Sequence, residues 1–170
     1  MPTSAACNPA NWNFRPAARS ASLLTSNRTA QFVLDTNVVS ELMLSALEDS
    51  VANRVKFHQK SSLFFTTISK AELLYGVAIK PAGKRKDVLA AKIAQVLQEV
   101  FAQRILPFDN DACQAYAQLA AARKEAGMSA DSTDIQIAAI AYSRNISVVT
   151  RNVKDFAHLG IEVINPWPAA

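Results

Sequence analysis

The chain has 170 residues, half of them apolar, which is enough to bury one hydrophobic core but leaves little for a second domain. Its formal charge of +4 does not by itself indicate a nucleic-acid partner, because residues 1–30 hold three arginines and no acid, which leaves 15 basic and 14 acidic residues in 31–170. Cys7 and Cys113 are too few and too far apart for a disulfide framework, and no apolar run reaches the roughly 18 residues of a membrane span. We expect a cytoplasmic protein with no membrane segment.

Residues 1–30 show neither helical nor strand periodicity and contain three prolines, so we expect a disordered leader. Its lack of acids and its Arg and Ser content faintly resemble an organellar transit peptide. An ordinary tail, or a start of translation placed too far upstream, explains the same composition more simply. The folded domain is therefore expected to span residues 31–170.

From Gln31 onward, short apolar strands alternate with amphipathic helices. In chain order the predicted elements are strand 32–34, helix 38–47, strand 62–67, a helix capped by Ser69 and running to about Ile79, helix 87–103, strand 105–108, helix 111–125, a helix that begins at Asp134, strand 146–150 and strand 163–164. This alternation predicts an α/β fold with a mainly parallel sheet covered by helices on both faces. In such sheets ligands bind beyond the carboxyl ends of the strands.

Two acids are candidates for such a site, and each has a simpler explanation. Asp35 directly follows the first strand, although Asp is also a good N-cap for the helix after it. Glu72 is expected in the first turn of its helix, where a capping box with Ser69 would account for it, and the local sequence favours that account. Neither residue alone establishes a site.

Asp134 is harder to explain as a capping residue. The residues three, four and seven positions later, Ile137, Ala138 and Ala141, place Asp134 on the apolar stripe of its helix. A buried carboxylate needs a partner, and no Lys or Arg lies one turn away on that stripe. A metal ion would meet this need.

Asp155 and Asn152 follow the strand that ends at Thr150, where either could complete a site. Both residue types also form ordinary turns, and Asp155 is a possible cap for a short helix at 156–159. Several carboxylates at one sheet edge repel one another unless a cation neutralises them, and an all-oxygen cluster suits Mg²⁺ or Mn²⁺. Such ions promote phosphodiester hydrolysis without a protein nucleophile.

Motifs of other enzyme classes are absent from the sequence. It contains no GxGxxG, no GxxxxGK[ST] and no GxSxG, and it has only four glycines. A small-molecule phosphohydrolase is disfavoured because no glycine-rich loop is present to hold a compact phosphate. His58 and His158 are isolated, and we expect both to be surface or packing residues rather than general bases.

Four blocks of this sequence, in order, resemble those of PIN-domain toxins of the VapC family, nearest the FitB-like branch. The blocks are FVLDTNVVSEL, TTISKAELLYGV, STDIQIAAIAYSRNISVVTRNVKDF and INPW, and the resemblance covers roughly residues 32–168. The resemblance implies a PIN-like α/β/α sandwich that cleaves RNA with Mg²⁺. It also implies a cognate VapB-like or FitA-like antitoxin, a toxin homodimer, and contact with operator DNA only through the antitoxin.

By this resemblance the catalytic acids are Asp35, Glu72 and Asp134, with metal binding by Asp35 and Asp134. The fourth acid is open: part of the family has an acid at the place of Asn152, whereas this chain offers Asp155 three residues later. Asn152 would bind through its carbonyl oxygen or through water. The polar neighbours of these acids are further candidates: Thr36, Asn37, Thr150 and Arg151.

Two groups of basic residues are candidates for contact with the RNA backbone. Lys80 and Lys84 to Lys86 form the densest run, in which we interpret Lys84 to Lys86 as a solvated loop, and Arg144, Arg151 and Lys154 are expected near the acidic end of the last long strand. Arg151 is favoured because it adjoins the candidate site. The alternative to a nuclease is a catalytically weak PIN-fold module that acts mainly through antitoxin binding and operon co-repression, which only Asn152 supports.

Overall fold

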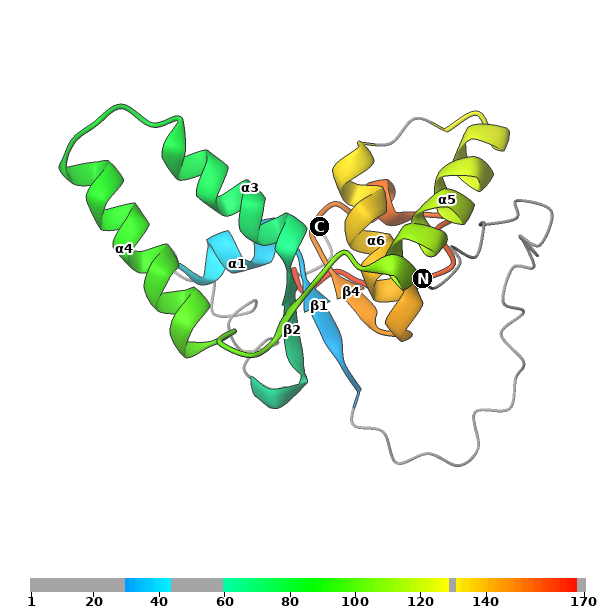
Figure 1. Ribbon diagram of the computed structural model, residues 1–170, viewed down its shortest axis with the longest axis horizontal. Coiled ribbons are helices and arrows are strands. Elements are labelled where there is room, and N and C mark those ends of the chain that lie inside the picture. Colours follow the sequence, from blue (N-terminus) through cyan, green and yellow to red (C-terminus); the bar gives the residue numbers. More distant parts are fainter. Residues whose placement is uncertain (1–29, 44–59, 129–130, 168–170) are drawn as a thin grey trace, which may run out of the picture.

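The computed structural model describes residues 30–43, 60–128 and 131–167 of the chain. Within them lies a parallel sheet with strand order β3–β2–β1–β4–β5, flanked by helices on two sides (Figure 1). This confirms the predicted α/β architecture. The predicted leader up to Thr29, the helix beyond Met43, Cys7 and His58 lie outside the described residues.

The strands are short, and every pair that they form is parallel. They are β1 (Phe32–Leu34), β2 (Leu63–Thr66), β3 (Ile105–Leu106), β4 (Ser147–Val149) and β5 (Val163–Ile164). β1 pairs on one side with β2, through Phe32 and Leu63, and on the other side with β4, through Val33 and Val148. The chain therefore builds the sheet in one direction from β1 to β3 and then returns to the other side of β1.

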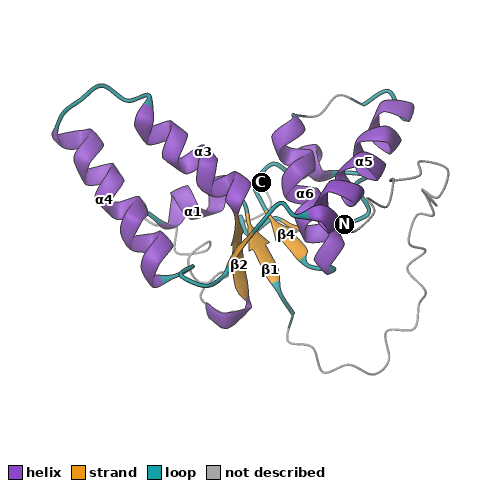
Figure 2. Ribbon diagram, in the orientation of Figure 1, coloured by secondary structure: helices purple, strands orange, loops and turns teal. Residues whose placement is uncertain are grey.

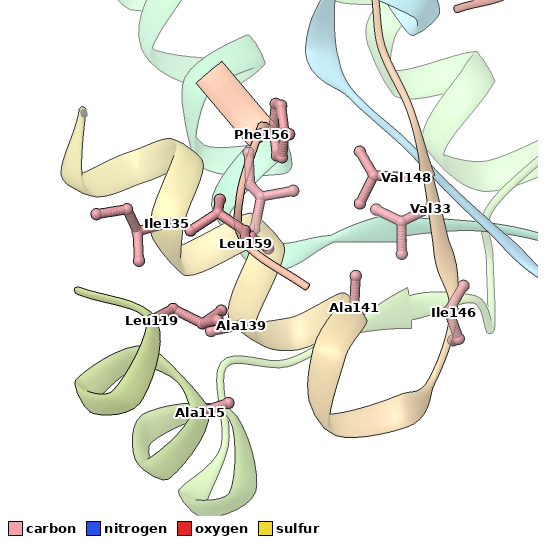
Figure 3. Close-up of a cluster of buried hydrophobic side chains, with 12 residues drawn as sticks. Val33, Ala115, Leu119, Ile135, Ala139, Ala141, Ile146, Val148, Phe156 and Leu159 are labelled. Carbon is pink, nitrogen blue, oxygen red and sulfur yellow. The ribbon is translucent and has the colours of Figure 1, made fainter. Parts of the chain in front are cut away.

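Alternate residues of the central strands enter two separate hydrophobic cores, because successive side chains of a strand point to opposite faces. Phe32 and Leu34 pack in the first core, whereas Val33 packs in the second. The first core contains Phe65 stacked on Phe101 with ring centroids 5.1 Å apart. Figure 3 shows part of the second core, where Val33 of the sheet lies near side chains of the helices that cover this face.

The helices form the two outer layers of the sandwich. α1 (Thr36–Leu42), α3 (Thr67–Ala78) and α4 (Lys84–Glu99) contribute to the first core, and α5 (Asn110–Glu125) and α6 (Ser132–Arg144) contribute to the second. Figure 2 shows α3 and α4 on one side of the strands, and α5 and α6 on the other. No helix of the described ranges is long and apolar enough to cross a membrane.

Several predicted boundaries differ from the structure. α1 begins at Thr36 rather than Val38, α4 covers 84–99 rather than 87–103, and α6 begins at Ser132 rather than Asp134. The strands are one to two residues shorter than predicted at the end of β3 and at both ends of β2 and of β4. Apolar periodicity shows which face of a helix is buried, but the polar cap that starts or ends the helix lies outside that periodicity.

Candidate active site

Asp35 lies where β1 ends, at the point where the strand order reverses between β1 and β4. Its backbone N–H donates to the carbonyl of Val149 (3.0 Å), and its Oδ1 accepts the N–H of Thr36 (2.7 Å) as the N-cap of α1. The strand-end and N-cap interpretations of Asp35 therefore both hold. Such a switch point is where open α/β sheets bind their ligands.

Thr150 and Asn37 fix the orientation of the Asp35 carboxylate. The Thr150 hydroxyl donates to Asp35 Oδ2 (2.7 Å) and accepts from Asn37 Nδ2 (3.0 Å) and from the Asn152 N–H (3.0 Å), so its one donor and two acceptor positions are all used. Asn37 Nδ2 also donates to Asp35 Oδ2 (2.8 Å). This network joins the ends of β1 and β4, which lie over a hundred residues apart in the chain.

The Asp35 side chain is held in a buried position despite its charge. Only 6% of Asp35 is exposed, and this burial raises the pKa of its carboxyl group. Hydrogen bonds from Thr150, Thr36 and Asn37 lower the pKa again in part, whereas the nearby Asp155 carboxylate raises it further. The neutral form of Asp35 is therefore favoured more than in a solvent-exposed aspartate.

Glu72 lies near the middle of α3, not in its first turn. The helix begins at Thr67, and its N-cap is Thr66, whose hydroxyl accepts the N–H of Ser69 (2.9 Å). The predicted N-cap at Ser69 and its capping box with Glu72 are therefore wrong. Thr66 both ends β2 and caps α3, and the prediction fails because Thr67, a residue type common in strands, begins the helix instead of extending the strand.

Glu72 is instead bound to the other side of the site. Its Oε2 accepts a hydrogen bond from the hydroxyl of Thr36 (2.5 Å), 36 residues earlier. Burial raises the pKa of Glu72, and the nearby Asp35 and Asp131 raise it further against the effect of the Thr36 hydrogen bond. The contact places the Glu72 carboxylate next to the N-terminus of α1.

Asp134 is the third residue of α6, behind the N-cap Asp131, which accepts the N–H of Thr133 (2.9 Å). Three residues on the same side of the helix are fully buried: Ile137, Ala138 and Ala141. The prediction that Asp134 lies on the inward-facing stripe of its helix is thus confirmed, and the side chain itself is partly buried.

Asp134 carries the largest pKa shift of these acids. Burial is the first cause that raises its pKa to about 6, followed by the charges of Asp155, Asp35, Asp131 and Glu72. Among the described residues, every charge with a resolved effect on Asp134 is negative. The acids lie close enough to repel one another, as expected for a site that binds a cation.

Asp155 lies on a 3₁₀ turn, η3 (Val153–Phe156), that follows β4. The predicted helix at 156–159 with Asp155 as its cap is therefore wrong: Asp155 lies inside the turn, which Phe156 anchors in the second core with 1% exposure. Asn152 precedes the turn and is exposed, and its side chain does not cap the turn. Of the two, Asp155 affects the pKa of Asp35 and Asp134.

The basic residues near the last strands separate to opposite ends of the sheet. Arg151 is exposed beside the acids, with its guanidinium 5.3 Å from the ring centroid of Trp167. Arg144 lies at the opposite end, where α6 leads into the start of β4, and forms an ion pair with Asp109 (2.5 Å). Its predicted place near the acidic end is thus wrong, because it precedes β4 whereas the acids lie beyond the carboxyl ends of the strands.

The basic run between α3 and α4 has a structural function. Lys84, Arg85 and Lys86 begin α4, and Lys86 Nζ donates to the carbonyls of Ala78 (2.9 Å) and Lys80 (3.1 Å) at the end of α3. Lys86 thereby satisfies carbonyls that a helix end leaves without partners. Lys84 and Arg85 are exposed, as predicted, but they lie in the first turn of α4, so the predicted loop is wrong.

Sequence reasoning missed two residues at this site. Asp131 is not among the predicted site residues, yet its charge raises the pKa of both Glu72 and Asp134. Arg123 on α5 is 4% exposed and reaches the turn that carries Asp155. The stripe that Ala112, Ala115 and Leu119 form on α5 continues to Arg123, and this spacing was the available signal.

The chemistry of these side chains suits a hard divalent cation, because the candidate donors are oxygen atoms. Within residues 30–43, 60–128 and 131–167, no three His, Cys, Asp or Glu side chains lie close enough to bind one ion together. The acids influence one another through their charges instead, which is compatible with an ion such as Mg²⁺ that binds one or two carboxylates directly and keeps several waters.

Comparisons with known proteins identify relatives of this chain over most of its length. The VapC ribonuclease Y4jK of Sinorhizobium fredii is 37% identical over 138 residues, which cover 81% of this chain and 99% of that protein. Toxin FitB of Neisseria gonorrhoeae is 35% identical over 135 residues, which cover 79% of this chain and 97% of that toxin. A solved structure of FitAB bound to an IR36 DNA fragment superposes with a TM-score of 0.76 at 33% identity, and covers 82% of this chain and 98% of that one.

The family model for the PIN domain matches residues 32–162, a range that contains all four candidate acids. The sequence blocks, the sheet order and the superposition all agree with this match. The chain belongs to the PIN domain family.

Proposed function

We propose that this protein is a divalent-metal-dependent endoribonuclease and the toxin of a type II toxin–antitoxin pair. One observation carries the proposal: acids from four separate segments of a PIN domain lie near the strand-order switch point, where neighbouring carboxylates raise the pKa of Asp35, Glu72 and Asp134. The names of the relatives, a VapC ribonuclease and a FitB toxin, support the substrate class and the biological role.

Asp35 and Asp134 are the proposed metal ligands, and Mg²⁺ is the proposed ion, with Mn²⁺ as a substitute. When bound, the ion polarises the phosphodiester and lowers the pKa of its water. The residues of the chain supply the geometry: Thr150 and Asn37 orient Asp35, and Thr36 orients Glu72. Glu72 and Asp155 add negative charge near Asp134 that attracts the cation.

Asp155, rather than Asn152, is the proposed fourth acid. Asp155 carries a charge that acts on both proposed ligands, whereas Asn152 is exposed and contributes its backbone N–H to the Thr150 hydroxyl. The alternative function, a catalytically weak module that acts through its antitoxin, depends on Asn152 being the position that matters.

The proposed protein partners follow from the same family. A VapB-like or FitA-like antitoxin would bind this chain, and operator DNA would be contacted only through that antitoxin; the similar FitAB structure was solved bound to a DNA fragment. A toxin homodimer completes the proposed assembly.

Cleavage of a mixed single-stranded RNA in Mg²⁺ tests the enzyme, with EDTA and Asp35→Asn as the inactivating conditions. Asn is itself a good N-cap, so Asp35→Asn is expected to fold. Asp111→Asn is the matched control, because Asp111 is exposed on α5 and is not one of the proposed catalytic acids. Cleavage that persists in EDTA or in Asp35→Asn would refute the assignment, and Mn²⁺ titration separates the nuclease from an inactive module, which should bind the ion weakly or not at all.

A further inference from the structure

Arg123 is a buried cation that the proposed reaction does not use. It lies in the last turn of α5, and its exposure is only 4%. Burying a charged side chain costs several kcal/mol unless it is paired or hydrogen-bonded, so the groups that it contacts are central to its role.

The guanidinium of Arg123 binds the backbone of the turn after β4. Nη1 donates to the carbonyl of Asp155 (2.5 Å) and makes a longer contact with the carbonyl of Ala157 (3.4 Å). Arg123 therefore spans from the helical layer to η3 and contacts the backbone of a proposed catalytic acid directly. Hydrogen bonds that involve a charged donor are about twice as strong as neutral ones.

Besides its own backbone hydrogen bonds, the turn is held by apolar side chains that pack in the second core. Phe156 and Leu159 are each 1% exposed and pack beside Leu119 and Ile135 of α5 and α6 (Figure 3). These apolar contacts hold the turn against the helices, but they are non-directional and do not set the orientation of the peptide unit at Asp155. The hydrogen bond from Arg123 does set it, because it is made to that carbonyl.

The orientation at Asp155 matters for the site, because its carboxylate acts on both Asp35 and Asp134. A rotation of the peptide unit would move this carboxylate relative to the other acids. We propose that Arg123 is a positioning residue of the acidic site: by binding the carbonyls of Asp155 and Ala157, it holds the Asp155 carboxylate where it contributes to binding of a divalent cation. The inference rests on the proposed function, which supplies the cation.

The test uses the full chain and two substitutions of Arg123. Arg123→Lys keeps the positive charge but loses the planar guanidinium. Arg123→Gln removes the charge and keeps an amide donor, so it leaves no unpaired buried charge and serves as the second variant if Arg123→Lys fails to fold. Arg104→Lys is the matched control, because Arg104 also donates to a backbone carbonyl, that of Val100, but lies at the start of β3. Melting temperature is measured for every variant.

The readout is the affinity for Mn²⁺ alone, measured by calorimetry, together with the Mg²⁺ concentration that gives half-maximal RNA cleavage. We expect Arg123→Lys and Asp155→Asn each to weaken Mn²⁺ binding by about 10-fold, the lower end of the effect seen for residues that orient metal ligands. A double variant that combines Arg123→Lys with Asp155→Asn should bind Mn²⁺ no more weakly than Asp155→Asn alone, since Arg123 acts through Asp155. Arg104→Lys should bind Mn²⁺ as the unmodified protein does.

The possible outcomes separate this inference from the proposed function. If the unmodified protein binds Mn²⁺ and cleaves RNA while folded Arg123 variants keep its affinity, Arg123 is only structural and the inference is overturned. An additive loss in the double variant, or an Asp155→Asn variant with unchanged affinity, overturns it as well. If the unmodified protein neither binds Mn²⁺ nor cleaves RNA, the proposed function fails first and the inference fails with it.

Discussion

Replacement of Asp134 by Asn should stabilise the metal-free protein at neutral pH while removing its response to metal. The raised pKa of Asp134 means that the folded protein holds a proton on this side chain up to about pH 6, whereas the unfolded chain loses it near 3.8. The folded state therefore binds more protons between about pH 4 and 6, so its free energy of unfolding falls as pH rises through that interval. Asn does not titrate and avoids this loss.

The size of the effect follows from the pKa. A pKa of about 6 in place of 3.8 corresponds to about 3 kcal/mol for a fully buried group. Asp134 is only partly buried, so solvent screening reduces this to about 1–2 kcal/mol. The ionised carboxylate also interacts favourably with the N-terminus of α6, and losing this costs about 0.5 kcal/mol. The net gain is about 1 kcal/mol, or about 2–4 °C in melting temperature for a domain of this size.

Thermal unfolding in EDTA at pH 4.5 and pH 8 measures the pH-dependent gain in stability. The same measurement at pH 8 in Mg²⁺ measures the response to metal. Asp134→Asn should melt above the unmodified protein at pH 8 in EDTA and close to it at pH 4.5. Mg²⁺ at ten times its dissociation constant should stabilise the unmodified protein by about 1.4 kcal/mol and the variant by less. A difference in EDTA that is equal at both pH values, or a variant that responds fully to Mg²⁺, would contradict the reasoning.

Three further predictions concern the support of the site and the core. Thr150→Val removes the hydroxyl that binds Asp35, and should cost about 1–3 kcal/mol in the free energy of unfolding by denaturant, with Thr150→Ser close to the unmodified protein. Arg151→Ala should raise KM for RNA with little change in kcat and reduce the slope of log affinity against log salt by about 0.7, measured by anisotropy of labelled single-stranded RNA; an unchanged slope would exclude a phosphate contact. Phe101→Ala removes a fully buried ring stacked on Phe65, and should cost about 3–5 kcal/mol in denaturant unfolding, so a loss below 1 kcal/mol would show that the first core can collapse around the gap.

The sequence by itself determined the elements and most of the acids. Apolar runs of two to four residues and the period of the helices depend on local burial, which a single segment records in its own pattern. The position of Asp134 on an apolar stripe already indicates that its carboxylate requires a cationic partner. The charges that surround it in the structure are negative, which agrees with that requirement. The family resemblance assigned Glu72, for which local reasoning favoured the wrong explanation.

Only the tertiary structure decided which segments meet. The position of β4 beside β1 brings Thr150 to Asp35, and the packing of α3 against α1 brings Glu72 to Thr36. The tertiary structure also places Arg144 at the end of the sheet away from the acids, and places Arg123 within hydrogen-bond distance of the turn that carries Asp155. The pattern of a segment records whether each face is buried but not which segment covers it, and strand order depends on how all the covered faces pack together.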